Sequence, residues 1–419
     1  MKHTRLSILG FALCLTIGIH AQTTTANEEE LALPEGMKTQ EIDSLLRDWY
    51  ARNYLTFDEQ CETTNENPTF EEKEYIRRLS RLPNVIQMPY NDVVRKYIDQ
   101  YSGRLRRTVS VMLGASNFYN PIFEEALESY QLPLELRYLP VIESALNPSA
   151  TSRAGAVGLW QFMIGTGKQY GLEVTSLIDE RKDPIKSSYA AAHYLKDLYD
   201  IFGDWALVLA CYNCGPGNIS KAIKRAGGIK DYWAICPYLP KETQGYVPAF
   251  IAANYIMNHY CDHNICPVNT TLPSGTDTLM LNRDVSMDRI IQVCGIGEDE
   301  LKALNPQYRT SLIPGETHPC TLRMPSDKIS LFLEAGDSVY CSRSEAMITS
   351  RNTEKEKGQL QEQESEPTEN TGRGKSVTVR NGDSLGAIAR RNHTTVSKLR
   401  KLNGLRNDNI RAGQKLKVR

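Results

Sequence analysis

The sequence predicts a mainly α protein in which a large helical domain precedes small α+β modules. Three observations support this fold class. Apolar residues recur at helical spacing over residues 70–265, the C-terminal part contains an internal repeat whose copies begin and end with strand-like runs, and a polar stretch separates the two copies. A length of 419 residues suits about two to four domains, and 41% hydrophobic residues is ordinary for globular protein.

The helical domain is predicted over residues 90–265. Four runs in this region have helical spacing or lack the alternation of strands: residues 93–101, 187–202, 205–211 and 246–260. Residues 22–89 are predicted to form an N-terminal lead-in with helices. Its first part, residues 22–64, is polar and acidic and includes one short predicted helix near residues 39–54.

The first 21 residues have the pattern of a secretory signal peptide. Lys2 and Arg5 precede an apolar run over residues 6–19, and Ala21 ends a plausible cleavage site. A lipoprotein signal that uses Cys14 is the alternative. We therefore expect an exported, periplasmic protein, which is associated with the outer membrane only if Cys14 is lipidated.

The cysteines fit export but define no reactive centre. Nine remain without Cys14, and because this number is odd, at least one is free or pairs between chains. Cys211-x-x-Cys214 is compatible with a redox or zinc site, or with buried residues or a structural disulfide. The second interpretation is favoured because no matching pair or βαβ pattern accompanies it. No cluster has metal-ligand spacing, so we expect neither metal nor cofactor.

The internal repeat consists of two copies with the same spacing. In each copy a Ser lies 19 residues before an Asn, which lies 10 residues before a Gly. The positions are Ser286, Asn305 and Gly315 in the first copy and Ser384, Asn403 and Gly413 in the second. Each copy is predicted to be a β-α-α-β unit, over 276–326 and 376–419, with residues 344–375 as a flexible linker.

Charge is concentrated at the C-terminus. The whole chain has a net charge of −1, which gives no reason to expect a nucleic-acid partner, whereas residues 373–419 hold 13 Lys and Arg against two Asp. This basic region by itself suits an anionic polymer such as cell wall, membrane surface or nucleic acid.

Glu143 is the strongest candidate for chemistry. It ends an apolar run over residues 132–142 and precedes a Gly-rich, aromatic turn. Burial in such a setting favours the protonated carboxyl, which can act as a general acid on a glycosidic oxygen. Most glycosidases use two carboxylates, but no convincing second one accompanies Glu143.

Five ordered segments carry a resemblance to a known family. They are E-S-x-x-N-P at 143–148, S-x-x-G-A-x-G-L-W-Q at 152–161, M-x-x-T-G at 163–167, A-x-Y-N-x-G-x-G at 210–217 and E-T-x-x-Y-V at 242–247. Together they resemble the soluble lytic transglycosylase domain, whose fold is lysozyme-like and which cleaves peptidoglycan.

The resemblance implies roles for individual residues. Glu143 would be catalytic, acting first as acid and then as base, while the sugar's acetamido group and C6 hydroxyl complete the reaction with a 1,6-anhydro end. The residues carried over as substrate-binding are Ser152, Gln161, Met163, Tyr212, Asn213, Glu242 and Tyr246. The glycines Gly155, Gly158, Gly215 and Gly217 would let the main chain approach the sugar.

The second repeat copy resembles a LysM module, a family that binds N-acetylglucosamine-containing chains such as peptidoglycan. The resemblance places six residues beside the sugar groove: Gly382, Asp383, Ser384, Leu385, Asn409 and Ile410. For Asp383 and Ser384 a helix N-cap is the alternative role. The first copy has Asp284-Val285 where the second has Gly-Asp, so it resembles a degenerate LysM whose sugar binding stays open.

The resulting hypothesis is a lytic transglycosylase that holds glycan strands through LysM. Two alternatives remain: a hydrolase similar to goose-type lysozyme, which would use water, and a non-catalytic wall-binding scaffold.

Overall fold

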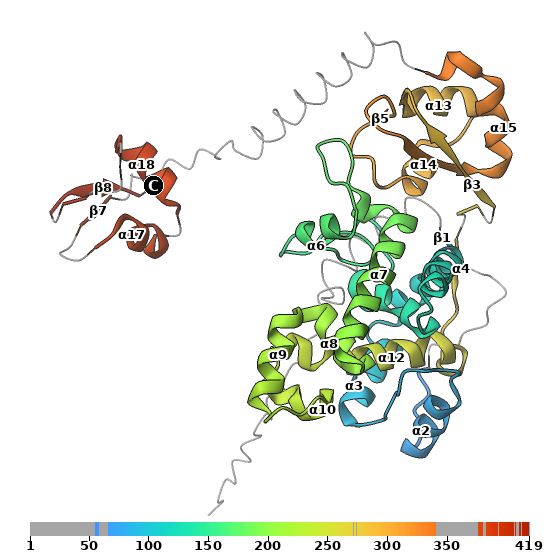
Figure 1. Ribbon diagram of the computed structural model, residues 1–419, viewed down its shortest axis with the longest axis horizontal. Helices are drawn as coiled ribbons and strands as arrows, with labels where there is room; N and C mark the ends of the chain where they lie inside the picture. The colour runs from blue at the N-terminus through green and yellow to red at the C-terminus, as the bar shows by residue number, and fades with distance from the viewer. Residues whose placement is uncertain are drawn as a thin grey trace, which may run out of the picture. The chain divides into compact units, whose positions relative to one another are not determined.

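The computed structural model describes residues 55–57, 66–340 and 376–418, apart from residues 271, 274, 380–382, 393, 406, 408–409 and 412. The chain forms two compact units, one within residues 1–347 and the other within residues 348–419 (Figure 1). The predictions of a signal peptide, a helix near 39–54 and a linker over 344–375 lie outside the described residues.

The first unit begins with a helical domain, which confirms the mainly α prediction. Its α-helices are α2 (Glu72–Arg81), α3 (Asp92–Ser102), α4 (Arg106–Ser129), α5 (Leu139–Ser144), α6 (Ile164–Gln169), α7 (Pro184–Phe202), α8 (Trp205–Cys214), α9 (Pro216–Arg225), α10 (Tyr232–Ile235), α11 (Lys241–Gln244) and α12 (Tyr246–His259). Short 3-10 helices η2 (Leu134–Tyr138), η3 (Glu180–Lys182), η4 (Cys236–Tyr238) and η5 (Cys261–His263) connect them. Strands β1 (Leu55–Phe57) and β2 (Val268–Thr270) pair antiparallel. Within the described residues, no helix has the length and apolarity to span a membrane.

Helix α12 forms the centre of the core. Every residue from Tyr246 to Met257 is buried, as expected for a helix that is apolar on all sides. It packs against α3, α5 and α8. Helix α3 buries Val94, Tyr97 and Ile98, which confirms the spacing seen in the sequence.

Local sequence signals fix the α7–α8 pair. The Asp183 side chain caps α7 by accepting from the backbone amides of Ile185 and Lys186. The helix ends at Gly203, whose φ of 67° suits glycine. Asp204 then caps α8 through the amide of Leu207. The two helices are therefore joined tightly.

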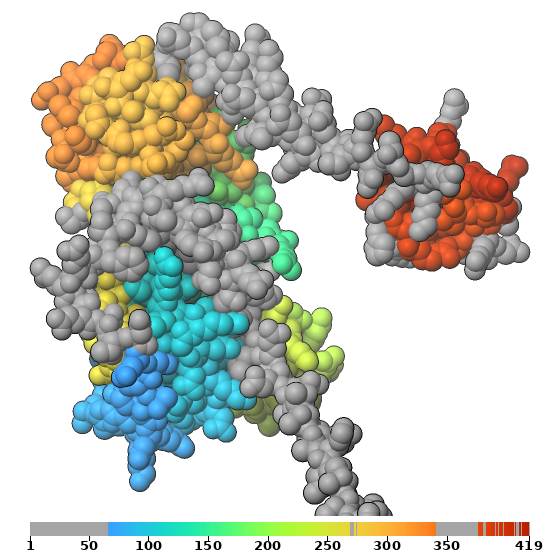
Figure 2. Space-filling view, turned by 180° about the vertical axis from the view of Figure 1, so that it is seen from behind, coloured from blue at the N-terminus to red at the C-terminus, as the bar shows by residue number. Residues whose placement is uncertain are grey.

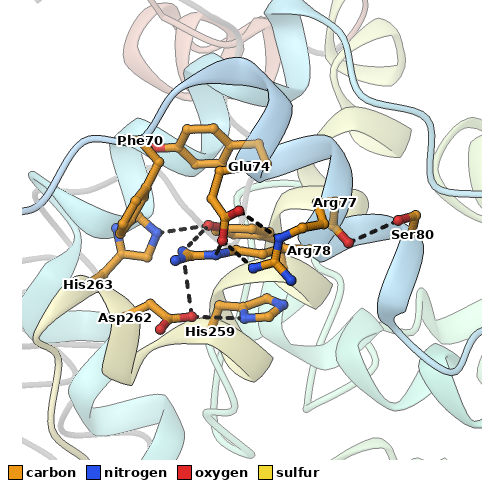
Figure 3. A network of polar contacts seen from close by, with 10 residues as sticks. Phe70, Glu74, Arg77, Arg78, Ser80, His259, Asp262 and His263 are labelled. Carbon is orange, nitrogen blue, oxygen red and sulfur yellow. Dashed lines mark hydrogen bonds and ion pairs between the residues drawn. The ribbon is translucent and has the colours of Figure 1, made fainter.

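A buried polar network ties the lead-in helix α2 to the end of α12 (Figure 3). Arg78 donates to the Tyr255 hydroxyl at 3.0 Å and to Glu74 at 2.8 Å. The Tyr255 hydroxyl also lies 3.2 Å from Nε2 of His263. Burial, aided by the charge of Arg78, lowers the pKa of His263 to about 4, so this histidine is neutral at physiological pH.

A LysM-like module follows the helical domain. Strand β3 (Thr276–Leu281) pairs antiparallel with β6 (Cys320–Pro325), and helices α13 (Met287–Cys294) and α14 (Glu298–Leu304) lie between them in sequence. A second antiparallel pair joins β4 (Asp284–Ser286) to β5 (Leu312–Pro314). Helix α15 (Ser326–Glu334) and the 3-10 helix η6 (Gly336–Val339) add Phe332 and Val339 to the same core, so the module extends beyond residue 326.

The C-terminal unit has the predicted β-α-α-β order. Strands β7 (Ser376–Thr378) and β8 (Lys415–Lys417) pair antiparallel, and helices α17 (Leu385–Arg391) and α18 (Val396–Asn403) lie between them in sequence. Ile388, Leu399 and Leu416 form the centre of its core.

The repeat spacing has a structural reason. In the first copy the Asn305 side chain donates to the Arg323 carbonyl and accepts from the Arg323 amide. Asn403 makes the same two bonds with Lys417 in the second copy. The Asn therefore ties the second helix to the last strand in each copy, which explains its fixed position.

Candidate active site

Glu143 lies in the last turn of α5, as the sequence predicted. The helix stops because Ala145 and Leu146 adopt left-handed conformations, with φ of 50° and 62°. Their amides close the turn onto the carbonyls of Val141 and Pro140. Both residues are buried, so the turn that presents Glu143 is held by packing even though such angles are unfavourable for residues other than glycine.

The side chain of Glu143 lies in a group with two tyrosines. The Tyr246 hydroxyl, at the start of α12, donates to Oε1 of Glu143. Burial raises the pKa of Tyr246 well above its ordinary value, and the charge of Glu143 raises it further. The same two causes raise the pKa of Tyr212. Both phenols therefore stay protonated and act as donors beside the carboxyl group.

Tyr212 connects this group to the following loop. Its hydroxyl donates to the Trp160 carbonyl at 2.8 Å. The Trp160 ring is fully buried, and its Nε1 donates to Ser188 on α7 at 2.9 Å. Ser144, next to Glu143, donates to the Leu159 carbonyl at 2.9 Å. The loop is therefore bonded both to Tyr212 and to the residue that follows Glu143.

The loop over residues 150–162 is folded on itself, and two predicted site residues support it. The Ser152 hydroxyl accepts from the Ala156 amide at 3.1 Å. Gln161 has a φ of 49°, and its side-chain amide donates to the Gly158 carbonyl at 2.8 Å. The contacts of both side chains therefore shape the loop.

The interpretation of Gly158 as a point of close approach to sugar is wrong. Its φ is 88°, and an added Cβ would lie 1.8 Å from the carbonyl oxygen of Arg181. The missing side chain makes room for η3 packed behind the loop. At Gly155, whose φ is 87°, an added Cβ would meet nothing within 4 Å.

The remaining predicted site residues lie on α8, on α11 and directly after the loop. Asn213 is exposed at the end of α8, and Thr243 of α11 donates to its Oδ1 at 2.8 Å. Glu242 is the exposed neighbour of Thr243. Met163 follows the loop with a 44% exposed side chain.

Sequence reasoning missed Tyr194 and Thr243. The Tyr194 ring centroid lies 5.3 Å from that of Tyr212, and Tyr194 contributes to the raised pKa values of Tyr212 and Tyr246. Tyr194 follows His193, and only the helical register of α7 could have indicated that it faces α8. Thr243 stands inside the E-T-x-x-Y-V segment and could have been included with it.

Cys211 and Cys214 are free thiols, so the pair is not a disulfide. Burial raises the pKa of Cys211 to about 12 and also raises that of Cys214, which makes the thiolate form unfavourable. Cys266 is disulfide-bonded. In the described part of the chain, no group of three or more His, Cys, Asp or Glu residues is arranged to hold a metal ion.

In the C-terminal unit the predicted groove residues differ in their contacts. The Ser384 hydroxyl accepts from the Ala387 amide, so its N-cap role is present, and Asp383 pairs with Arg391. Leu385 is 2% exposed and belongs to the core. Ile410 is half-buried, while Gly382 and Asn409 lie outside the described residues.

Three family models match consecutive parts of the chain. The transglycosylase SLT domain matches residues 120–234, the LysM-like domain of lytic transglycosylase MltD matches 275–341, and the LysM domain matches 377–419. Together with the helical fold and the Glu143 group, these matches define a lytic transglycosylase with LysM-type modules.

One relative identifies the family to which the chain belongs within this class. Membrane-bound lytic murein transglycosylase D of Escherichia coli K12 is 30% identical over 335 residues, which cover 79% of this chain and 70% of the relative. The chain therefore belongs to the membrane-bound lytic murein transglycosylase D family.

Two further matches cover about a third of this chain. Soluble lytic murein transglycosylase of E. coli K12 is 32% identical over 143 residues, which cover 32% of this chain and 22% of the relative. The crystal structure of the 70 kDa soluble lytic transglycosylase of E. coli matches with 29% identity and a TM-score of 0.30, and covers 34% of this chain and 24% of that chain.

Proposed function

We propose that this protein cleaves the β-1,4 bond between N-acetylmuramic acid and N-acetylglucosamine in peptidoglycan and leaves 1,6-anhydro ends. The observation that carries the proposal is Glu143, which is held by the Tyr246 hydroxyl at the end of an apolar helix. The family membership and the LysM match support the choice of substrate.

The proposed reaction uses one carboxyl group twice. Protonated Glu143 donates its proton to the glycosidic oxygen as the bond from this oxygen to C1 breaks, and the substrate's acetamido carbonyl stabilises the sugar cation. The C6 hydroxyl of the same muramic acid then forms a bond to C1 and gives its proton to Glu143. The carboxyl group is regenerated, and no water is consumed.

The surrounding residues have supporting roles in this proposal. Tyr246 fixes the rotation of the carboxyl group, and Tyr212 connects the carboxyl group to the loop. Three further residues offer surfaces to the sugar: Met163, Asn213 and Glu242. Ser152 and Gln161 shape the loop that borders the substrate.

The C-terminal module would hold the strand. Binding there keeps glycan near the catalytic domain at a raised effective concentration, on the order of millimolar for a flexible linker that spans the gap. The predicted linker over residues 344–375 would set this distance.

The test uses purified sacculi and matched variants. We expect wild type to release fragments with anhydro ends, and Glu143→Gln to reduce the rate by about 100- to 10,000-fold, the usual contribution of a general acid or base. Glu128→Gln, which changes an exposed glutamate at the end of α4, is the control and should retain activity. Full activity of Glu143→Gln would contradict the assignment, and reducing muramic ends would favour a hydrolase.

The proposal includes export of the protein from the cytoplasm. The protein would act in the periplasm, and lipidation of Cys14 would add attachment to the outer membrane. The relative's description as membrane-bound is compatible with such an attachment. Metabolic labelling with a fatty acid, compared between wild type and Cys14→Ser, tests it: label in both or in neither would rule out lipidation at this residue.

A further inference from the structure

The LysM-like module is joined to the helical domain through the segment over residues 172–182. The Arg309 amide donates to the Leu177 carbonyl at 2.9 Å, and the Asp179 amide donates to the Gln307 carbonyl at 2.8 Å. Ile178 is 2% exposed and belongs to the core of the module. Figure 2 shows the yellow and orange module directly against the helical domain. Backbone bonds and a shared core therefore make the junction a fixed one.

A buried carboxylate at this junction binds arginines from both sides. Asp179 is 1% exposed, and it accepts from Nε and Nη2 of Arg181 at 2.8 Å each. Arg309 of the module donates to the same carboxylate at 2.6 Å. Burial alone would raise the pKa of Asp179, but the two arginines lower it below its ordinary value, so the carboxylate is ionised.

Arg181 carries this connection to the active-site loop. Its Nη1 donates to the carbonyls of Gly155 and Phe162, both at 3.1 Å. These carbonyls lie in the loop that contains Ser152 and Gln161 and that supplies the Trp160 carbonyl to Tyr212. A chain of charged hydrogen bonds therefore runs from the module to the loop beside Glu143.

In the LysM-like module, the counterparts of the predicted sugar-binding segments are bonded to each other. By the internal repeat, residues 284–287 and 311–312 correspond to the segments predicted to flank the sugar in the C-terminal copy. Here Ser286 pairs with Leu312 where β4 meets β5, and the Met287 amide donates to the Ser311 carbonyl at 2.7 Å. Val285 and Ile313 are fully buried. The backbone groups that join these two segments are therefore bonded to each other and are not free to bind a ligand.

We propose that the LysM-like module is a fixed brace of the catalytic domain, in which Arg309 and Asp179 are positioning residues that hold the 150–162 loop through Arg181. The inference rests on the proposed function for its effect on turnover. It predicts that the module is needed for catalysis and does not bind glycan at β4 and β5.

The test removes the guanidinium group through which the module contacts Asp179. Arg309→Met in the full-length protein keeps the length of the side chain and removes the charge and the donors. Lys302→Met is the matched control, because Lys302 forms an exposed pair with Glu298 on α14 of the same module. Arg309→Lys restores the charge. Asp179→Asn removes the negative charge that both Arg181 and Arg309 contact. All variants are compared at a temperature at which circular dichroism shows them folded.

Two measurements are made on each variant. In Arg309→Met we expect amide hydrogen exchange of Val157, Gly158 and Phe162 to rise about tenfold, the effect of one partly exposed charged hydrogen bond, while exchange in α4 stays unchanged. We expect kcat on glycan strands to fall by a similar factor with little change in KM, partial recovery in Arg309→Lys, and wild-type behaviour in Lys302→Met.

The outcomes separate this inference from the proposed function. Unchanged exchange in the loop of Arg309→Met would overturn the brace, and so would a rise spread equally over α4. Faster loop exchange with unchanged kcat would overturn the catalytic role of the positioning residues. A wild-type protein without turnover would contradict the proposed function, whereas the exchange measurement would still decide whether the module holds the loop.

Discussion

Replacing Tyr246 by Phe isolates the contact on which the proposed mechanism depends most. The change removes one oxygen from a side chain that is 1% exposed and keeps the ring in the core. The lost bond is the one from the hydroxyl to Oε1 of Glu143. A carboxyl group without this donor can rotate, and its anion, which forms after the first proton transfer, loses a stabilising partner.

The size of the effect follows from the type of bond. A hydrogen bond to a charged group contributes about 1.5–3 kcal/mol. Because each 1.36 kcal/mol corresponds to a factor of ten in rate, we expect kcat to fall about 10- to 150-fold in Tyr246→Phe, with KM little changed. The assay is release of soluble fragments from purified sacculi, followed over time at several substrate concentrations.

Tyr255→Phe is the matched control. Tyr255 is also fully buried on α12, and at nine residues from Tyr246 it lies about 14 Å further along the helix axis. It loses bonds to Arg78 and His263, so its stability should fall by a comparable amount while kcat stays at the wild-type value. A Tyr246→Phe variant with wild-type kcat, or equal losses of kcat in both variants, would refute the reasoning.

Three further predictions concern stability and binding. Burial lowers the pKa of His263 from 6.5 to about 4, so the unfolded state binds the extra proton between these values and stability falls as the pH drops through this window. Urea unfolding should show a loss of about 2 kcal/mol from pH 7 to pH 5 that His263→Gln removes; an unchanged loss in this variant would count against the assignment. Gly158→Ala should lower the free energy of unfolding by more than about 3 kcal/mol, whereas Gly155→Ala, which meets no neighbour, should cost only about 1–2 kcal/mol; equal losses would disprove the close packing against η3. An N-acetylglucosamine oligomer titrated into the full-length protein should shift NMR amide signals of residues 383–385 and leave those of 284–286 in place. The reverse pattern would contradict the proposal that the LysM-like module does not bind glycan at β4 and β5.

The sequence was most informative where local physics decides the structure. Helix α12 is apolar on all sides and is therefore buried, and the Asn spacing of the repeat reflects a bond between a helix and a strand in each copy. The apolar run before Glu143 placed the carboxyl group at a helix end, and the structure adds that Tyr246 bonds to it.

The sequence could not reveal contacts between distant residues. Arg309 and Asp179 are separated by 130 positions, and neither lies in a periodic pattern or a recognised segment. Gly158 was misinterpreted for a related reason. Glycine is favoured both by a positive φ and by a closely packed neighbour. Only the structure shows that this neighbour is the Arg181 backbone rather than a sugar.

The central claim is that Glu143 alone acts as acid and base and that the sugar's own hydroxyl replaces water. The most direct measurement is digestion of sacculi in water enriched in ¹⁸O, followed by mass spectrometry of the new ends. The account predicts muramic ends that are lighter by one water than reducing ends and carry no ¹⁸O. Reducing muramic ends with one ¹⁸O would show that water attacks C1, and would contradict the claim.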